Sequence, residues 1–232
     1  MIPENISKIK SALPQGVRLI AVSKLKPLED IMQANEAGQR LFGENYATEL
    51  RDKHCQLPGD IEWHFIGHLQ SKQLKYYIPF VKMIHGVDSL EHLQDVEHAA
   101  AKAGRVVDVL LQLHVAKEET KFGFSPDELE KIQFSIFNFQ FVRVCGLMAM
   151  ASNTPDENRV RADFREARRI FDSLREGPFA GHPEFCELSM GMSHDWHIAV
   201  EEGSTLIRLG TSIFGARDYT QKTPHNPQTH NS

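Results

Sequence analysis

VRLIAVSKLKPL, residues 17–28, decides the fold that we predict for this chain. Its apolar run from Leu19 to Val22 is short and lies between Pro14-Gln15-Gly16 and Pro27, which is typical of a buried strand in a parallel sheet. Lys24 then stands where that strand ends. A desolvated amine has a lowered pKa, and a neutral amine attacks carbonyl groups to give a Schiff base. A lysine whose amine reaches water is the alternative for this stretch alone.

Seven further apolar runs follow this one, and segments of helical character alternate with them. The runs are Leu41-Phe42, Glu62–Ile66, Val81–Val87, Val106–Val115, Phe141–Met148, Glu184–Ser189 and Thr205–Leu209. Eight strands that alternate with helices predict an α/β protein with a single (β/α)8 TIM barrel, and an open doubly wound sheet is the alternative. We expect residues 1–217 to form one barrel domain and the polar residues 218–232 to form a disordered tail.

Helix start signals mark several segments between the strands. Ser125-Pro126-Asp127-Glu128 has serine as N-cap, proline at the first position and glutamate at the third, and Thr154-Pro155-Asp156-Glu157 repeats this signal. Asp88 and Ser193 are expected to begin two other helices. After Thr154, one stripe at helical spacing consists of Val160, Phe164, Ala167, Phe171 and Leu174.

The composition excludes several classes of protein. The 232 residues are 41% hydrophobic and 25% charged with a net charge of −5, so nothing draws the chain generally to nucleic acid or to an anionic membrane. No apolar run approaches the roughly 20 residues of a membrane helix, and the N-terminal MIPENISKIK lacks the apolar core of a signal peptide. The 3 cysteines have unrelated spacings, which predicts free thiols. We expect a cytoplasmic monomer that binds neither nucleic acid nor membrane.

The loops after the seventh and eighth predicted strands are unusual. Ser189-Met190-Gly191-Met192-Ser193 leads into a predicted helix, and Arg208-Leu209-Gly210-Thr211 leads into a helical turn. In a barrel these loops meet at the C-terminal face, where phosphate groups commonly bind backbone N–H groups. Both loops together favour a phosphate site, whereas either loop alone fits a tight turn with a capped helix equally well.

Arg208 adds a cation to this region. By alternation along its strand it shares a face with Leu206 and Gly210, and a barrel interior accepts an arginine poorly without a partner. We expect that partner to be a ligand or a carboxylate, with Glu44 as one candidate. A lysine able to form a Schiff base, a phosphate cradle and a nearby cation together suggest pyridoxal 5′-phosphate (PLP), with its aldehyde at Lys24 and its ring nitrogen near Arg208.

Six stretches spread along the chain form a recognisable set. They are AVSKLKP (21–27), FGENY (42–46), WHFIGHLQS (63–71), KFGF (121–124), GLMAMA (146–151) and ELSMGMSHDWHIAVEEGSTLIRLGTSIFGARDY (187–219). Together they closely resemble the YggS-type family of PLP homeostasis proteins, in the alanine-racemase-like barrel superfamily. The resemblance covers the chain from Val17 to Tyr219 and is specific because all six stretches occur together.

The resemblance implies roles for individual residues. Lys24 would carry PLP as a Schiff base, Arg208 would face the pyridine nitrogen, and Asn45 would lie near the ring. The residues implied to hold the phosphate are Ser189, Gly210 and Thr211, with Met190, Gly191 or Ser193.

Two positions depart from the family pattern. His68 stands where the family often has proline, and Lys72-Gln73 stands where it usually has asparagine and lysine. Any role of that family lysine would pass to Lys72 or Lys75. His64 and His68 are four residues apart, but on a strand and its following loop they do not stack on one face, so we expect no metal site.

Three functions remain open at this point: a PLP-binding protein of intracellular PLP homeostasis with PLP-requiring apoenzymes as candidate partners, a PLP-dependent amino-acid racemase, and a structural barrel without cofactor.

Racemisation needs a base on each face of the α-carbon, and Lys24 supplies one. In the racemases that this barrel resembles, the second comes from a separate domain of the partner subunit, for which the chain has no room after its eighth strand. An arginine at the pyridine nitrogen also weakens the electron sink. We therefore favour a binder over an enzyme. The candidate second bases are Tyr46, His68, His194 and His197.

Overall fold

The computed structural model describes residues 1–115 and 123–216, except for the side chains of Gln133 and Phe134. Within these residues the strands close into a parallel barrel in the order β1 to β8, which confirms the predicted (β/α)8 TIM barrel. The predicted tail at 218–232 and the first half of the KFGF stretch lie outside the described residues.

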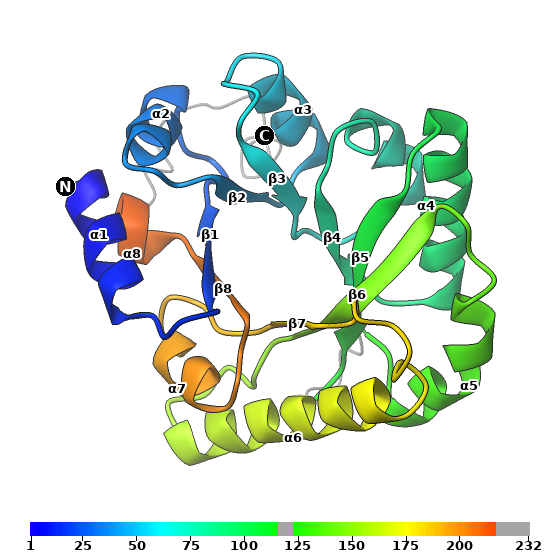
Figure 1. The fold of residues 1–232 in the computed structure, drawn as a ribbon. Helices are drawn as coiled ribbons and strands as arrows, with labels where there is room; N and C mark the ends of the chain where they lie inside the picture. Colours follow the sequence, from blue (N-terminus) through cyan, green and yellow to red (C-terminus); the bar gives the residue numbers. More distant parts are fainter. Residues whose placement is uncertain (116–122, 217–232) are drawn as a thin grey trace, which may run out of the picture.

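The strands form a ring when the barrel is viewed along its axis (Figure 1). They are β1 (Arg18–Val22), β2 (Leu41–Glu44), β3 (Glu62–Phe65), β4 (Met83–Val87), β5 (Val107–Leu113), β6 (Val142–Ala149), β7 (Glu187–Ser189) and β8 (Leu206–Leu209). The last strand pairs with the first, from Arg18 opposite Leu206 to Ala21 opposite Leu209, and this pairing closes the barrel.

The helices lie around the outside of the ring (Figure 1). They are α1 (Ile2–Ala12), α2 (Leu28–Glu36), α3 (Ala47–His54), the 3-10 helix η1 (Ser71–Tyr76), α4 (Leu90–Ala103), α5 (Pro126–Ile136), α6 (Glu157–Glu176), α7 (Trp196–Glu201) and α8 (Thr211–Phe214). In the described residues, no helix combines the length and the apolar character that a membrane span requires.

Helix α1 precedes the first strand, and the sequence patterns above do not predict it. Its signals are Pro3 in the first turn and an apolar spacing that includes Ile6 and Ile9, both of which are buried. The Asn5 amide donates a hydrogen bond to the carbonyl of Ile213 in α8 at 2.9 Å. Helix α1 therefore joins the first and last elements of the barrel, which lie side by side in Figure 1.

The predicted helix starts are partly correct. The capping box at Ser125 is confirmed, because its hydroxyl accepts from the Glu128 amide and the Glu128 carboxylate accepts from the Ser125 amide. The other N-caps are Ser89, Asp156 and Asp195 rather than Asp88, Thr154 and Ser193. Asp88 lies one residue before the cap of α4, and its carboxylate contacts the His92 ring at 2.5 Å.

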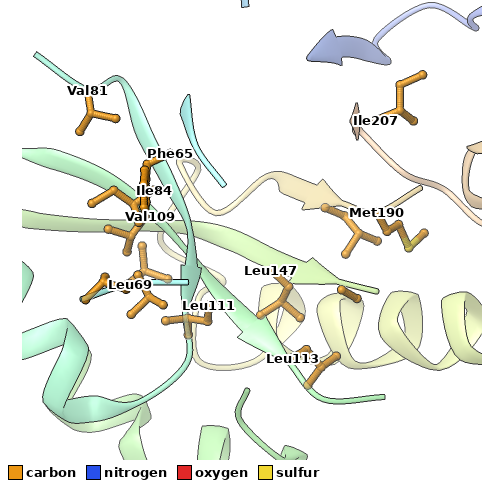
Figure 2. Close-up of a cluster of buried hydrophobic side chains, with 14 of the residues drawn as sticks. Phe65, Leu69, Val81, Ile84, Val109, Leu111, Leu113, Leu147, Met190 and Ile207 are labelled. Atoms are coloured by element: carbon orange, nitrogen blue, oxygen red, sulfur yellow. The ribbon is translucent and has the colours of Figure 1, made fainter. Parts of the chain in front are cut away.

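Side chains of the strands alternate between two cores. The outer core lies between the barrel and its helices, and Figure 2 shows part of it, with Phe65, Val109 and Leu147 among its members. The predicted stripe on α6 belongs to this core, since all five of its residues are buried. The inner core fills the middle of the barrel and contains Ile20, Met83, Leu110, Cys145, Met148 and Leu206.

Candidate functional site

A cavity of about 550 Å³ opens at the C-terminal ends of the strands, the face on which barrels carry their sites. Every strand, or the loop that follows it, contributes to the wall. The lining residues are Val22, Lys24, Asn45, Ile66, Gly67, His68, His85, Gln112, Met148, Met150, Met192, Ser193, His194, Arg208, Gly210 and Thr211. Six of the predicted site residues are therefore brought together: Lys24, Asn45, Ser193, Arg208, Gly210 and Thr211.

Lys24 lies at the mouth of the barrel, in the predicted position. It stands two residues after the end of β1, is half-buried and lines the cavity. Ser23, between the strand and Lys24, is fully buried, and its hydroxyl donates to Glu44 Oε1 at 2.6 Å. The main chain that carries Lys24 is thus fixed inside the fold, and the lysine side chain starts from a defined point.

Arg208 lies inside the barrel mouth, with an exposed fraction of 6%. Its guanidinium donates to Ser189 Oγ at 2.6 Å and to the Ala149 carbonyl at 3.2 Å. Burial lowers the pKa of Arg208 to about 10, against the opposing effect of Asp195, so the side chain stays charged at pH 7. The suggested pairing with Glu44 is wrong, because the Glu44 carboxylate contacts Ser23 and Lys53.

Two buried histidines continue the hydrogen bonds of Arg208 down the barrel. His85 Nδ1 lies 3.0 Å from Ser189 Oγ, and His85 Nε2 lies 2.8 Å from His64 Nδ1. Burial lowers the pKa of His64 to about 3 and holds the pKa of His85 well below its usual value, so both rings are neutral at pH 7.

The direction of this chain follows from Arg208, which can only donate. Ser189 Oγ therefore accepts from Arg208, and we assign the serine proton to the bond with His85 Nδ1. His85 then carries its own proton on Nε2 and donates to His64. The Ser189 hydroxyl is occupied on both sides by these bonds.

The loops after β7 and β8 meet at the cavity. Ser193 Oγ accepts from the Gly210 amide at 3.4 Å, and Thr211 lines the cavity beside them. Met190 instead belongs to the outer core, as Figure 2 shows, and Gly191 packs against α7, where a Cβ would come within 2.7 Å of Ala199 Cβ. Of the residues implied to hold phosphate, Ser193, Gly210 and Thr211 face the cavity, whereas Ser189, Met190 and Gly191 lie behind its wall.

Asn45, in the loop after β2, also lines the cavity, next to the loop after β3 and to strand β4. Its Oδ1 atom is buried and has no hydrogen-bond partner among the described residues. A Cβ on Gly67 would come within 2.1 Å of the Asn45 carbonyl oxygen, and a Cβ on Gly86 within 2.7 Å of the Gly67 carbonyl oxygen. Backbone thus packs directly on backbone here, and the Asn45 acceptor is left for a donor from the cavity.

Several lining residues were missed by the motif-based prediction, and alternation along the strands would have found some of them. His85 lies two residues after Met83 on β4, and Gln112 lies two after Leu110 on β5, so both point inward. Lys72 and Lys75 do not line this cavity. They line a separate groove with Asp95, His98 and Lys102, between η1 and α4.

Comparison with known proteins identifies the family of this chain. Residues 1–218 match the family model described as alanine racemase, N-terminal domain. A pyridoxal phosphate homeostasis protein of Aquifex aeolicus is 37% identical over 203 residues, which cover 87% of this chain and 88% of that protein. The chain belongs to the family of pyridoxal phosphate homeostasis proteins. A further member, from Escherichia coli, is 37% identical over 213 residues, 90% of this chain and 89% of that protein.

Solved structures agree with this family. PipY of Synechococcus elongatus PCC7942 is 36% identical and superposes with a TM-score of 0.88 without PLP and 0.84 with PLP bound, over 93% of this chain and 100% of PipY. Alanine racemase from E. faecalis superposes with a TM-score of 0.71 at 18% identity, over 93% of this chain and 57% of the racemase. That second likeness shows a common barrel fold only.

Proposed function

We propose that this chain binds PLP in intracellular PLP homeostasis and holds the cofactor as a Schiff base on Lys24. The observation that carries the proposal is the cavity, which brings Lys24, just after the first strand, together with Arg208 of the last strand and Thr211 at the start of α8. The names of the relatives and the PLP-bound PipY structure support it. PLP supplies an aldehyde for the lysine amine and a pyridine ring that accepts electrons.

The residues present fit such a group. The cavity volume of about 550 Å³ suits a small organic molecule, since such sites span about 300–1,000 Å³. The buried acceptor of Asn45 needs a donor, and the buried cation of Arg208 supplies a charged donor at the inner wall. Arg208 is held by Ser189 and by the two histidines behind it, so its position depends little on what occupies the cavity.

We assign the phosphate to the side of the cavity formed by Ser193, Gly210 and Thr211. These residues combine two hydroxyl groups with backbone N–H groups of two loops that contact each other. Ser189 takes a different role in the proposal, because its hydroxyl holds Arg208 rather than facing the cavity. Met190 and Gly191 shape the loop by packing against the outer core and α7.

A visible absorbance spectrum of the purified protein with PLP tests the proposal, followed by borohydride reduction and peptide mapping. The expected result is a yellow protein whose reduced adduct maps to Lys24. A colourless protein with no modified peptide would support a barrel without cofactor instead.

The phosphate assignment predicts strong discrimination against pyridoxal, which lacks the phosphate. Each charge-assisted hydrogen bond to the phosphate is worth roughly 1.5–3 kcal/mol. Two such bonds lost should weaken binding by about a hundredfold or more. Direct titration of the wild-type protein with both compounds measures this ratio. Equal affinities for pyridoxal and PLP would mean that the loops after β7 and β8 do not bind the phosphate.

The binder proposal predicts no racemase-like turnover. Of the four candidate second bases, only His68 and His194 line the cavity, and their side chains are 54% and 58% exposed. His197 instead packs against Trp196 with the two rings tilted by 32°, and 3.6 Å separates their centroids. Each of the two cavity-lining imidazoles is more than half exposed and lies beside a carboxylate, Asp88 for His68 and Asp195 for His194. We expect neither to act as a base on a substrate carbon, so only slow exchange from the Lys24 side is expected.

Deuterium exchange at the α-carbon of several L- and D-amino acids, followed by chiral analysis, measures this prediction. Exchange without inversion, far below rates of about 1–10³ per second, is the expected outcome. Inversion at enzymatic rates would favour the racemase alternative, and His68→Ala and His194→Ala would then identify the second base.

The proposal includes a cytoplasmic monomer that supplies PLP to PLP-requiring apoenzymes. Light scattering of the protein with and without PLP tests the oligomeric state. Mixing the loaded protein with an apoenzyme, and following the activity recovered against an equal concentration of free PLP, tests the transfer.

A further inference from the structure

Behind Lys24 lies a buried cluster of three ionisable side chains, which stands apart from the cavity. Lys53 of α3 is 5% exposed, and its amine donates to Glu44 Oε1 at 2.8 Å and to Glu49 Oε1 at 2.6 Å. Glu44 at the end of β2 is fully buried, and Glu49 of α3 is 5% exposed. None of the three lines the Lys24 cavity, so they do not touch its contents directly.

This cluster holds the main chain on both sides of Lys24. The Lys53 amine donates to the carbonyl of Ser23 at 2.7 Å, and the Leu25 amide donates to Glu49 Oε1 at 2.7 Å. Lys24 is therefore flanked by two main-chain groups, each fixed by a bond to a charged side chain. Such bonds are about twice as strong as bonds between neutral groups.

The conformation of Leu25 explains why the chain needs holding at this point. Its φ of +58° is the only positive φ of a residue other than glycine in the described part of the chain. Residues with a Cβ rarely adopt this conformation, and it persists where the surroundings impose it. The bond from the Leu25 amide to Glu49 is such a constraint, and it sets the direction in which the chain leaves Lys24.

Burying this cluster costs more free energy than attaching α3 to the barrel requires. Glu44 Oε2 and Glu49 Oε2 are buried and have no hydrogen-bond partner among the described residues. Burial raises the pKa of Glu44 to about 7, against the lowering effect of Lys53. Apolar side chains of similar size would pack the same space without this cost, so packing alone does not account for the charges.

We propose that Glu49 and Lys53 are positioning residues for Lys24: they fix the main chain at Ser23 and Leu25 so that the lysine amine is presented to the cavity. The inference rests on the proposed function, in which that amine forms the Schiff base. Glu44 completes the cluster by accepting from the Ser23 hydroxyl and from Lys53.

Glu49→Leu removes the acceptor for the Leu25 amide without leaving a large void, and Glu49→Gln keeps an oxygen that accepts from that amide. The matched controls are Glu97→Leu and Glu97→Gln. Glu97 is a half-buried carboxylate that accepts from the amides of Gln140 and Phe141, next to the N-terminal end of β6 and so at the opposite end of the barrel.

Two readouts do not need the cofactor. The first is hydrogen exchange of the Leu25 amide, and the second is the rate at which a small acylating reagent labels Lys24 in the absence of PLP. A third readout is the rate at which a borohydride-trapped adduct with PLP forms at Lys24. We expect Glu49→Leu to expose the Leu25 amide to exchange. We also expect it to lower the acylation rate and the adduct-formation rate at Lys24 by about tenfold or more, because misplacement of a reacting group costs this much. Glu49→Gln should recover most of the loss.

The outcomes separate this inference from the proposed function. Glu49→Leu with wild-type Lys24 labelling would overturn the positioning role, and so would equal effects of Glu49→Leu and Glu97→Leu. A wild-type protein that gives no PLP adduct at Lys24 would overturn the proposed function, while the acylation rates still decide the positioning role. If Glu49→Leu does not fold, the double variant Glu49→Leu/Lys53→Met replaces the pair by apolar groups, and it must show the same changes at Lys24.

Discussion

Replacing Lys24 with alanine is expected to abolish the borohydride-reducible adduct with PLP and to leave the barrel folded. The reason is that no lysine other than Lys24 is found among the described residues that line the cavity, so the variant removes the lysine amine from that part of the wall. The half-buried Lys24 lies in a loop and outside both hydrophobic cores, so little stability should be lost. Peptide mapping after reduction and a thermal melt of the same sample measure the two parts of this result.

Lys26→Ala is the matched control for this variant. Lys26 lies two residues further along the same loop, but its amine donates to the carbonyls of Phe214 and Ala216 at 3.1 Å each. It should therefore keep the adduct at Lys24. A Lys24→Ala protein whose main adduct with PLP forms at another lysine would refute the assignment of the Schiff base.

Acid is expected to destabilise the fold through the two buried histidines. Both have lowered pKa values in the folded protein, so below pH 6.5 the unfolded chain binds protons that the folded protein does not. The stability that the two neutral histidines contribute is fully present above pH 6.5. It falls as the pH decreases, and for His64 it continues to fall down to about pH 3. Each histidine contributes a slope of about 1.4 kcal/mol per pH unit.

Glu44 acts in the opposite direction over part of this range. Its pKa is raised to about 7, so the folded protein holds a proton that the unfolded chain loses, and the stability from Glu44 falls as pH rises from 4.5 to 7. The sum of the three groups therefore still favours unfolding in acid, with about one histidine's slope remaining between pH 4.5 and 6.5.

His64→Gln isolates one histidine, since the Glu44 effect is common to the wild type and the variant. Urea unfolding at several pH values from 4.5 to 7.5 measures both slopes. The variant is expected to be less stable at pH 7.5, because it disturbs the chain from His64 to Arg208, but its slope below pH 6.5 should be shallower by about 1.4 kcal/mol per pH unit. Parallel curves would mean that His64 is not neutral in the folded protein.

The fold and the position of Lys24 could be predicted because they depend on local pattern. Each strand is a short apolar run beside a helical segment, and the alternation that turns Leu206 inward also turns Arg208 inward. The partner of Arg208 could not be found in this way, because Ser189 and Ala149 lie on other strands.

The error at Glu44 has a simple physical cause. The predicted second strand ends at Phe42, whereas β2 continues to Glu44. With Phe42 in the outer core, alternation places Gly43 inside the barrel and Glu44 outside, beside α3. A prediction from apolar runs ends a strand too early when the last residue of that strand is charged, as Glu44 is. The bonds of Ser189 to Arg208 and His85 could not be predicted for a similar reason, since β7 is only three residues long and its inward face is hard to recognise.

The backbone contacts at Asn45, Gly67 and Gly86 have a consequence for how this barrel tolerates change. The loops after β2 and β3 and the strand β4 touch there through main-chain atoms, with room for a hydrogen atom but not for a methyl group. Any other residue at Gly67 or Gly86 must push the rim apart, whatever its chemistry. In a survey of variants these two glycines would stand out as sharply as Lys24, although they carry no reactive group.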